Sequence, residues 1–184
     1  YFLTLQIVRE ASLKARLPYW IYVQSYVSDH ENRRLPSDSD NRLQLFAPLT
    51  FGYTGISYFT YDGCFPNMNG EGFLHYGREK TALFDHAAQA NREVLNIGGP
   101  IRFLTSTQVR FLKATPSSPV PQGLRSWDRS TDREPLFKDI SIDVPETLPS
   151  DQIDEATYSA DSPYLGGLIG YFHDDNGQKY FMLT

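Results

Sequence analysis

Gly52-Tyr-Thr-Gly-Ile-Ser-Tyr-Phe-Thr-Tyr-Asp-Gly63 is the stretch of this 184-residue chain that decides its fold class. Ile56, Tyr58, Phe59 and Tyr61 are β-branched or aromatic, and such residues favour a pleated strand. Because apolar and polar residues do not alternate in the run, it predicts a parallel strand that is covered on both faces. The two glycines among its first four residues are expected to end a preceding helix and turn the chain into the strand.

Helical patterns and a second aromatic strand surround this run. The expected helices cover residues 1–16, 38–51 and 81–97, and the expected second strand covers residues 19–25. Ser37 and Asp40 form a variant of the capping box, and Gly98-Gly99-Pro100 is expected to stop the third helix. Strands that alternate with helices predict an α/β fold, with the two strands parallel and adjacent.

A β-hairpin is the clearest feature near the C-terminus. Two apolar runs, residues 168–172 and 178–184, flank Asn176-Gly177, a dipeptide typical of tight hairpin turns. Shorter strands are expected over residues 109–112 and 140–144. These elements indicate antiparallel β structure.

Two domains are expected because the composition changes after Ser106. Residues 1–106 carry the alternating helices and strands, and residues 107–184 carry a linker and the start of a β domain. Proline and serine dominate residues 115–123, and charged residues dominate 126–138, which predicts loops. Two strands make too small a sheet to stand alone, so we expect a second chain, a homo-oligomer or residues outside this sequence to complete it.

Charge and composition narrow the classes of partner. The net charge is -5 and the pI about 5.3, which disfavours nucleic acid and anionic membranes as partners. Cys64 is the only cysteine, so an internal disulfide is excluded, and the compartment stays undecided, with secretion or a periplasmic location left open. Aromatic residues make up 14% of the chain, which suits either a carbohydrate ligand or a large aromatic core.

Several segments together resemble a known family. They are Pro18-Tyr-Trp-Ile-Tyr-Val-Gln-Ser25, Arg34-Leu-Pro36 and residues 41–61. These segments resemble the last part of the catalytic barrel of clan A glycoside hydrolases, and are similar to family 42 β-galactosidases and their uncharacterised relatives. Asn91-Arg-Glu-Val94 resembles the closing helix of that barrel. The resemblance implies the C-terminal portion of a (β/α)8 TIM-type barrel over residues 1–106, followed by the beginning of an antiparallel β domain.

The resemblance also implies a retaining mechanism that uses two carboxylates. In the galactosidases a nucleophilic glutamate follows the aromatic strand, shortly before a histidine. Gly70-Glu71-Gly-Phe-Leu-His75 is similar, with one residue more between the two, so Glu71 is the candidate nucleophile. The family's acid/base carboxylate lies on an earlier barrel strand that this sequence does not contain.

Five further residues are candidates for substrate binding. Asp62, Gln24, Tyr26, Tyr61 and His75 follow or end the two expected strands. Since parallel strands deliver their following loops to the same edge of a sheet, these side chains are expected to surround one cleft. Structural roles stay open for them: a turn for Asp62, core hydrogen bonds for Gln24 and a surface position for His75.

Several other residues that suggest chemistry also have structural explanations. Trp20 and Phe65 could stack on a ligand, although core packing is the expectation for Trp20. Asp29-His30-Glu31 lacks the spacing of metal ligands, and Asp174-Asp-Asn-Gly177 suits a hairpin better than a calcium loop. We therefore expect no metal and no cofactor. Two functions remain open: a glycoside hydrolase, or a non-catalytic carbohydrate-binding or scaffold protein.

Overall fold

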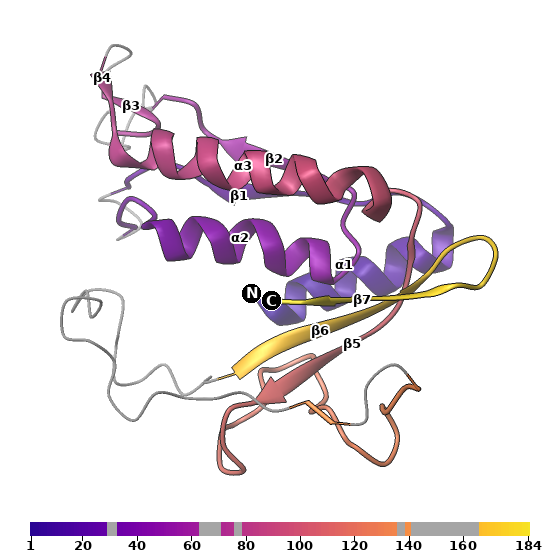
Figure 1. The fold of residues 1–184 in the computed structure, drawn as a ribbon. Coiled ribbons are helices and arrows are strands. Elements are labelled where there is room, and N and C mark those ends of the chain that lie inside the picture. The colour runs from indigo at the N-terminus through magenta and orange to yellow at the C-terminus, as the bar shows by residue number, and fades with distance from the viewer. Residues whose placement is uncertain (29–32, 63–70, 76–78, 136–138, 141–165) are drawn as a thin grey trace.

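The computed structural model describes residues 1–28, 33–62, 71–75, 79–135, 139–140 and 166–184. The helices are α1 (Phe2–Ala15), α2 (Asp38–Thr50) and α3 (Ala82–Ile101). The strands are β1 (Trp20–Gln24), β2 (Gly55–Phe59), β3 (Leu74–His75), β4 (Glu79–Lys80), β5 (Thr105–Lys113), β6 (Gly166–His173) and β7 (Lys179–Leu183). Figure 1 shows β1 and β2 alongside α2 and α3, with the β5–β6–β7 sheet in the opposite half.

The beginnings and ends of α1 and α2 follow from local chemistry. Asp40 N donates to the Ser37 hydroxyl at 3.2 Å, and the Asp40 carboxylate accepts from Ser37 N at 2.9 Å, so the capping box is confirmed. Arg16 takes a left-handed conformation with φ 55° and ends α1 before Leu17-Pro18. Gly52 ends α2 in the same way with φ 88°.

Helix α3 is longer than the sequence predicts. It continues through Gly98-Gly99-Pro100 and ends at Ile101, so the expected stop is wrong. A glycine ends a helix by taking positive φ, and neither Gly98 nor Gly99 does so. A proline removes one hydrogen bond, and near the end of a helix the freed carbonyl can bond water.

The predicted parallel pairing of β1 and β2 is confirmed. Trp20 lies opposite Gly55, and the register runs without a shift to Gln24 opposite Phe59. Within the described ranges these two strands form an open sheet with no third member. The barrel and the chain or residues that would complete it therefore remain predictions.

In the described part of the chain the β1–β2 sheet is covered on one face only, so a sheet covered on both faces stays a prediction that depends on the chain or residues that would complete it. Trp20 and Tyr22 project from one face of β1 and are 69% and 74% exposed. Ile21 and Val23, on the other face, lie partly or fully buried. Because aromatic and aliphatic residues occupy opposite faces, the sequence shows no polar alternation even though the strand has one solvent-facing side.

The β5–β6–β7 sheet is antiparallel in that order, and the predicted hairpin is confirmed. Gly177 has φ 79° in its turn. Strand β5 begins at Thr105, four residues before the predicted strand, because its polar start pairs with the end of β6. Of the strand expected over residues 140–144, only Ile140 is among the described residues, and it lies outside any strand.

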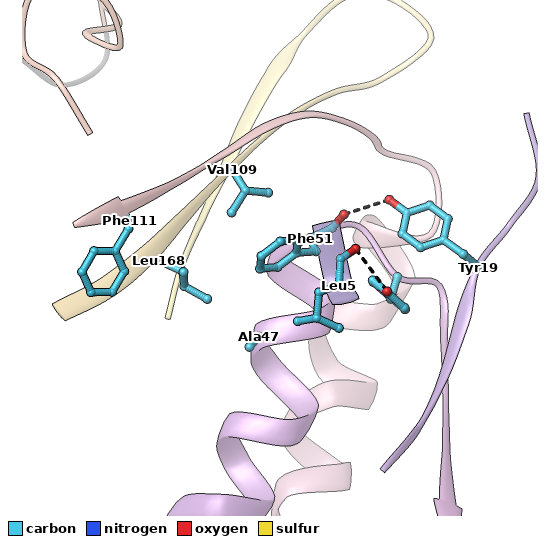
Figure 2. Packing of buried hydrophobic residues seen from close by; sticks show 8 residues of the cluster. Leu5, Tyr19, Ala47, Phe51, Val109, Phe111 and Leu168 are labelled. Atoms are coloured by element: carbon cyan, nitrogen blue, oxygen red, sulfur yellow. Dashed lines mark hydrogen bonds between the residues drawn. The ribbon is translucent and has the colours of Figure 1, made fainter. Parts of the chain in front are cut away.

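One buried cluster joins the helices to this sheet (Figure 2). Its members are Leu5, Tyr19, Ala47, Phe51, Tyr53, Val109, Phe111 and Leu168. The Tyr19 hydroxyl donates to Phe51 O at 2.8 Å, and the Tyr53 hydroxyl donates to Leu5 O at 3.2 Å. Residues on both sides of position 106 share this core, and the division into two domains stays a prediction.

Candidate functional site

The loops that follow β1 and β2 meet at the carboxyl edge of the two strands. Ser25 N donates to Phe59 O at 3.0 Å, and the Ser25 hydroxyl donates to Thr60 O at 2.7 Å. Further along, Val27 N donates to Glu71 O at 3.0 Å. These backbone bonds hold the chain around Glu71 against the loop after β1.

Glu71 and His75 form a pair at this edge. His75 Nδ1 lies 3.2 Å from Glu71 Oε1, and the backbones of the two residues also form an antiparallel bridge. The side chains are 40% and 46% exposed, so solvent and ligands can reach them. Asp62 pairs through its backbone with Leu74, the neighbour of His75. Glu71, Asp62 and His75 therefore lie on adjoining backbone segments.

The segment that carries Glu71 is anchored two residues further on. Phe73 is buried beside Leu83 and Ala87 of α3, and its ring meets that of Tyr58 edge-on with centroids 4.9 Å apart. Thr81 N donates to Phe73 O at 2.9 Å. The position of Glu71 is thus set by packing on the helical side of the sheet.

Tyr58 links that packing to β2. Its hydroxyl donates to Asn91 Oδ1 of α3 at 2.9 Å. Burial raises the pKa of Tyr58 to about 12, although the bond to Asn91 acts in the opposite direction. The side chain therefore stays neutral and serves as a fixed support behind the sheet.

Gln24 and Tyr26 have structural partners at the same edge. The Gln24 side-chain amide donates to Tyr26 O at 2.9 Å and to Arg34 O at 2.8 Å. The Tyr26 ring is 7% exposed and meets the Phe59 ring edge-on at 5.9 Å. Both side chains hold the loop after β1 in place, and direct contact of the Gln24 amide N–H groups with a sugar would require one of these bonds to break.

Three side chains form what we call the aromatic face: Trp20, Tyr22 and Phe59. The register of β1 and β2 places all three on the side of the sheet away from α2 and α3. The rings of Tyr22 and Phe59 meet edge-on with centroids 6.4 Å apart. Tyr61, at the end of β2, is also exposed. A hollow of about 670 Å³ lies at the edge of β1, between Tyr22 and Gln24 of the strand and Leu43 and Gln44 of α2.

The expectation that Trp20 packs in the core is wrong. Its indole lies across Gly55 of β2, where a Cβ atom would come within 2.3 Å of Trp20 Cδ2. A glycine inside a strand marks such a close approach, so Gly55 was the signal in the sequence for a ring lying flat on the sheet.

Metal binding finds no support in the described part of the chain. No group of three or more His, Cys, Asp or Glu side chains there could hold an ion. Asp29-His30-Glu31, Cys64 and Phe65 lie outside the described residues. Asp174 Oδ1 accepts from Asn176 N and Gln178 N, both at 2.9 Å, which confirms the hairpin interpretation of that segment. None of the described helices has the length and apolar character needed to cross a membrane.

Comparison with known proteins leaves the function to be argued from this geometry. The resemblance to clan A glycoside hydrolases rests on the segments quoted from the sequence. A search of protein-family models, curated proteins and solved structures finds no match to the chain.

Proposed function

We propose that the aromatic face and the adjoining edge of β1 and β2 bind a carbohydrate, and that Glu71 is the nucleophile of a retaining glycoside hydrolase site. The observation that carries the proposal is the exposure of Tyr22 and Phe59 on the sheet whose carboxyl edge adjoins Glu71, with Trp20 on the same face at the amino end of β1. Large exposed apolar groups side by side indicate a recognition surface. Aromatic rings in such a position can stack on the C–H face of a sugar.

The edge supplies the polar half of the site. The Glu71 carboxylate can accept hydrogen bonds from sugar hydroxyls, and His75 Nδ1, 3.2 Å away, can orient that carboxylate. A retaining enzyme needs a second carboxyl group about 5 Å from the nucleophile. Asp62 is the second acid at this edge, whereas the family resemblance assigns the acid/base role to a residue outside this sequence.

The chemistry proposed for Glu71 is a double displacement. Its carboxylate attacks the anomeric carbon, the leaving-group oxygen takes a proton from the general acid, and a covalent glycosyl-enzyme forms. Water then attacks the same carbon, with the former acid acting as base, and releases the sugar with retained configuration.

Non-catalytic carbohydrate binding is the second candidate function. The observation that favours it is the half-exposed Glu71–His75 pair, because exposed pairs of this kind also occur on surfaces without catalytic roles. In that case the aromatic face still binds a sugar, and Glu71 contributes only a hydrogen bond.

A single substitution separates the candidates. Glu71→Gln keeps the shape and removes the nucleophilic charge, so hydrolysis of an aryl β-galactoside should fall at least about a thousandfold while binding of methyl β-galactoside persists. Glu10→Gln, at an exposed position on α1, is the matched control. Binding without hydrolysis in a protein that also carries the acid/base carboxylate would establish the second candidate. Absence of both would overturn the proposal.

A further inference from the structure

We propose a second ligand site, on the outer face of the β5–β6–β7 sheet, that binds a neutral polyhydroxylated molecule such as a pyranose. The site is a cleft of about 530 Å³, within the size range of small-molecule pockets. We call it the outer cleft, and its principal lining residues are Gln108, Asp132, Glu134, His173, Lys179 and Phe181. It involves none of the residues of the aromatic face.

The strand register builds the floor of the outer cleft. Gln108, Tyr171 and Phe181 form one row across the three strands, and His173 and Lys179 belong to the next row. The Tyr171 and Phe181 rings meet edge-on with centroids 5.3 Å apart. The floor is therefore aromatic, with polar side chains in the row beside it.

The wall of the outer cleft is held in place by buried hydrogen bonds. Asp132, only 4% exposed, accepts from Arg110 Nε at 3.0 Å and from Asp128 N at 2.9 Å. The Tyr171 hydroxyl donates to Asp132 O and accepts from Trp127 Nε1, both at 2.9 Å. A wall that is already ordered loses little conformational entropy when a ligand binds.

The charges of the outer cleft favour a neutral ligand. Asp132 is paired with Arg110, and Glu134 lies 2.8 Å from Lys179 Nζ. An anion or a cation would compete with one of these existing pairs and would have to separate it. A ligand that both donates and accepts hydrogen bonds can use them while they stay intact.

His173 adds an acceptor of defined position. Its Nδ1 lies 2.8 Å from Asp174 O, and because a carbonyl oxygen only accepts, Nδ1 carries the hydrogen. In the neutral ring Nε2 is then an acceptor that a sugar hydroxyl can use. The aromatic floor, the ammonium and carboxylate groups and this acceptor together match the C–H and O–H groups of a sugar ring.

The test uses a Trp20→Ala parent, in which stacking on the aromatic face is lost and Trp127 is the sole tryptophan. Trp127 reports on the outer cleft because its indole bonds the Tyr171 hydroxyl. Methyl α-glucopyranoside, methyl α-mannopyranoside and methyl β-galactopyranoside are titrated separately, with fluorescence and amide chemical shifts as readouts. At least one of the three glycosides should give saturable changes in the amide chemical shifts of Gln108, His173 and Phe181. The charged sugars glucuronate and glucosamine should bind no more tightly than that neutral glycoside.

Variants then assign the binding to named groups. His173→Phe and Phe181→Ala should each weaken binding by about tenfold, the loss expected for one buried hydrogen bond or one stacking contact. His173→Gln should retain much of the affinity that His173→Phe loses, because the carbonyl oxygen of the glutamine side chain can act as an acceptor near the position of His173 Nε2. Leu95→Ala, at an exposed position on α3, is the control. Two outcomes overturn the proposal: no saturable change with any glycoside, or unchanged affinity in both His173→Phe and Phe181→Ala.

Discussion

The two tryptophans of the chain lie on two sheets that differ in how they are covered. Trp20 lies on β1 with its indole 69% exposed over Gly55. Trp127 packs on the β5–β6–β7 sheet, and its indole N–H donates to the Tyr171 hydroxyl. Tryptophan is thus solvent-exposed on the β1–β2 sheet and packed and hydrogen-bonded on the β5–β6–β7 sheet. The side chains that surround it on each sheet account for this contrast.

The covering layers explain this contrast. The inner face of the β5–β6–β7 sheet packs on α1 and α2 through Phe111 and Leu168 (Figures 1 and 2). Its outer face is partly covered by Trp127. The β1–β2 pair contacts helices on one face only. We therefore expect substitutions on the inner face of the β5–β6–β7 sheet to affect stability, and those on the exposed face of the β1–β2 sheet to affect binding.

The largest effect should come from truncating the shared core. Phe51 is fully buried between α1, α2 and the β5–β6–β7 sheet, so Phe51→Ala should lower the free energy of unfolding by about 3–5 kcal/mol. Tyr22→Ala, on the aromatic face, should change it by less than about 1 kcal/mol. Urea unfolding followed by circular dichroism measures both, and equal losses would contradict the contrast.

The next largest difference in stability should come from replacing a carboxylate in each of the two regions. Asp132→Asn removes the charge that pairs with Arg110 beneath the outer cleft, and we expect a loss of about 2–3 kcal/mol. Glu71→Gln, at the half-exposed edge, should cost no more than about 0.5 kcal/mol. Thermal unfolding of both variants gives the comparison. A more stable Asp132→Asn protein would mean that the buried pair is no structural support.

Two glycines provide a matched test of close packing. A Cβ atom at Gly170 would lie 2.2 Å from Thr50 O, and backbone cannot move aside easily, so Gly170→Ala should destabilise by about 1–3 kcal/mol. At Gly55 the obstacle is the exposed Trp20 side chain, which can rotate away. Gly55→Ala should therefore lower the stability of the fold by less than Gly170→Ala does, and it should shift the fluorescence emission of Trp20. The reverse order of costs would show that Trp20 is fixed in place.

The smallest effect concerns the start of α2. Burial alone would raise the pKa of Asp40, but hydrogen bonds from Ser37 and the pairing with Arg34 lower it below its usual 3.8. A lowered pKa means that Asp40 stabilises the fold above about pH 4, and that this contribution is lost as the pH falls through the folded-state pKa. Asp40→Asn should cost about 1 kcal/mol at neutral pH. The difference from the unmodified protein should vanish in acid, and a difference independent of pH would contradict this.

Local signals predicted the elements that depend on local chemistry. The capping box at Ser37, the hairpin at Asn176-Gly177 and the parallel pairing of β1 with β2 all follow from short-range patterns. The position of Trp20 is not predictable from local sequence, because its indole lies over Gly55, which is 35 positions further along the chain and comes opposite Trp20 only after the strands pair. The stop of α3 was misplaced because glycine permits positive φ without requiring it.

The candidate sites were predictable to different degrees. Parallel strands made it possible to expect Asp62, Glu71 and His75 near one edge, and the described backbone segments that carry them do adjoin. The partners of Gln24 could not be foreseen, since they are carbonyl groups of a loop without regular structure. The outer cleft needed the register of three strands and the position of Asp132, neither of which leaves a pattern in the sequence.

Titration of a Trp127→Phe protein, in which Trp20 is the sole tryptophan, tests the central claim most directly. With methyl β-galactopyranoside and longer β-galactosides, the account predicts a saturable blue shift of the Trp20 emission and protection from quenching by acrylamide, because a stacked sugar removes water from an indole that is 69% exposed. Tyr22→Ala in the same background should weaken the response, and Leu95→Ala should leave it unchanged. An emission and a quenching constant that stay the same at every concentration of these sugars would contradict the assignment of the aromatic face as a carbohydrate site.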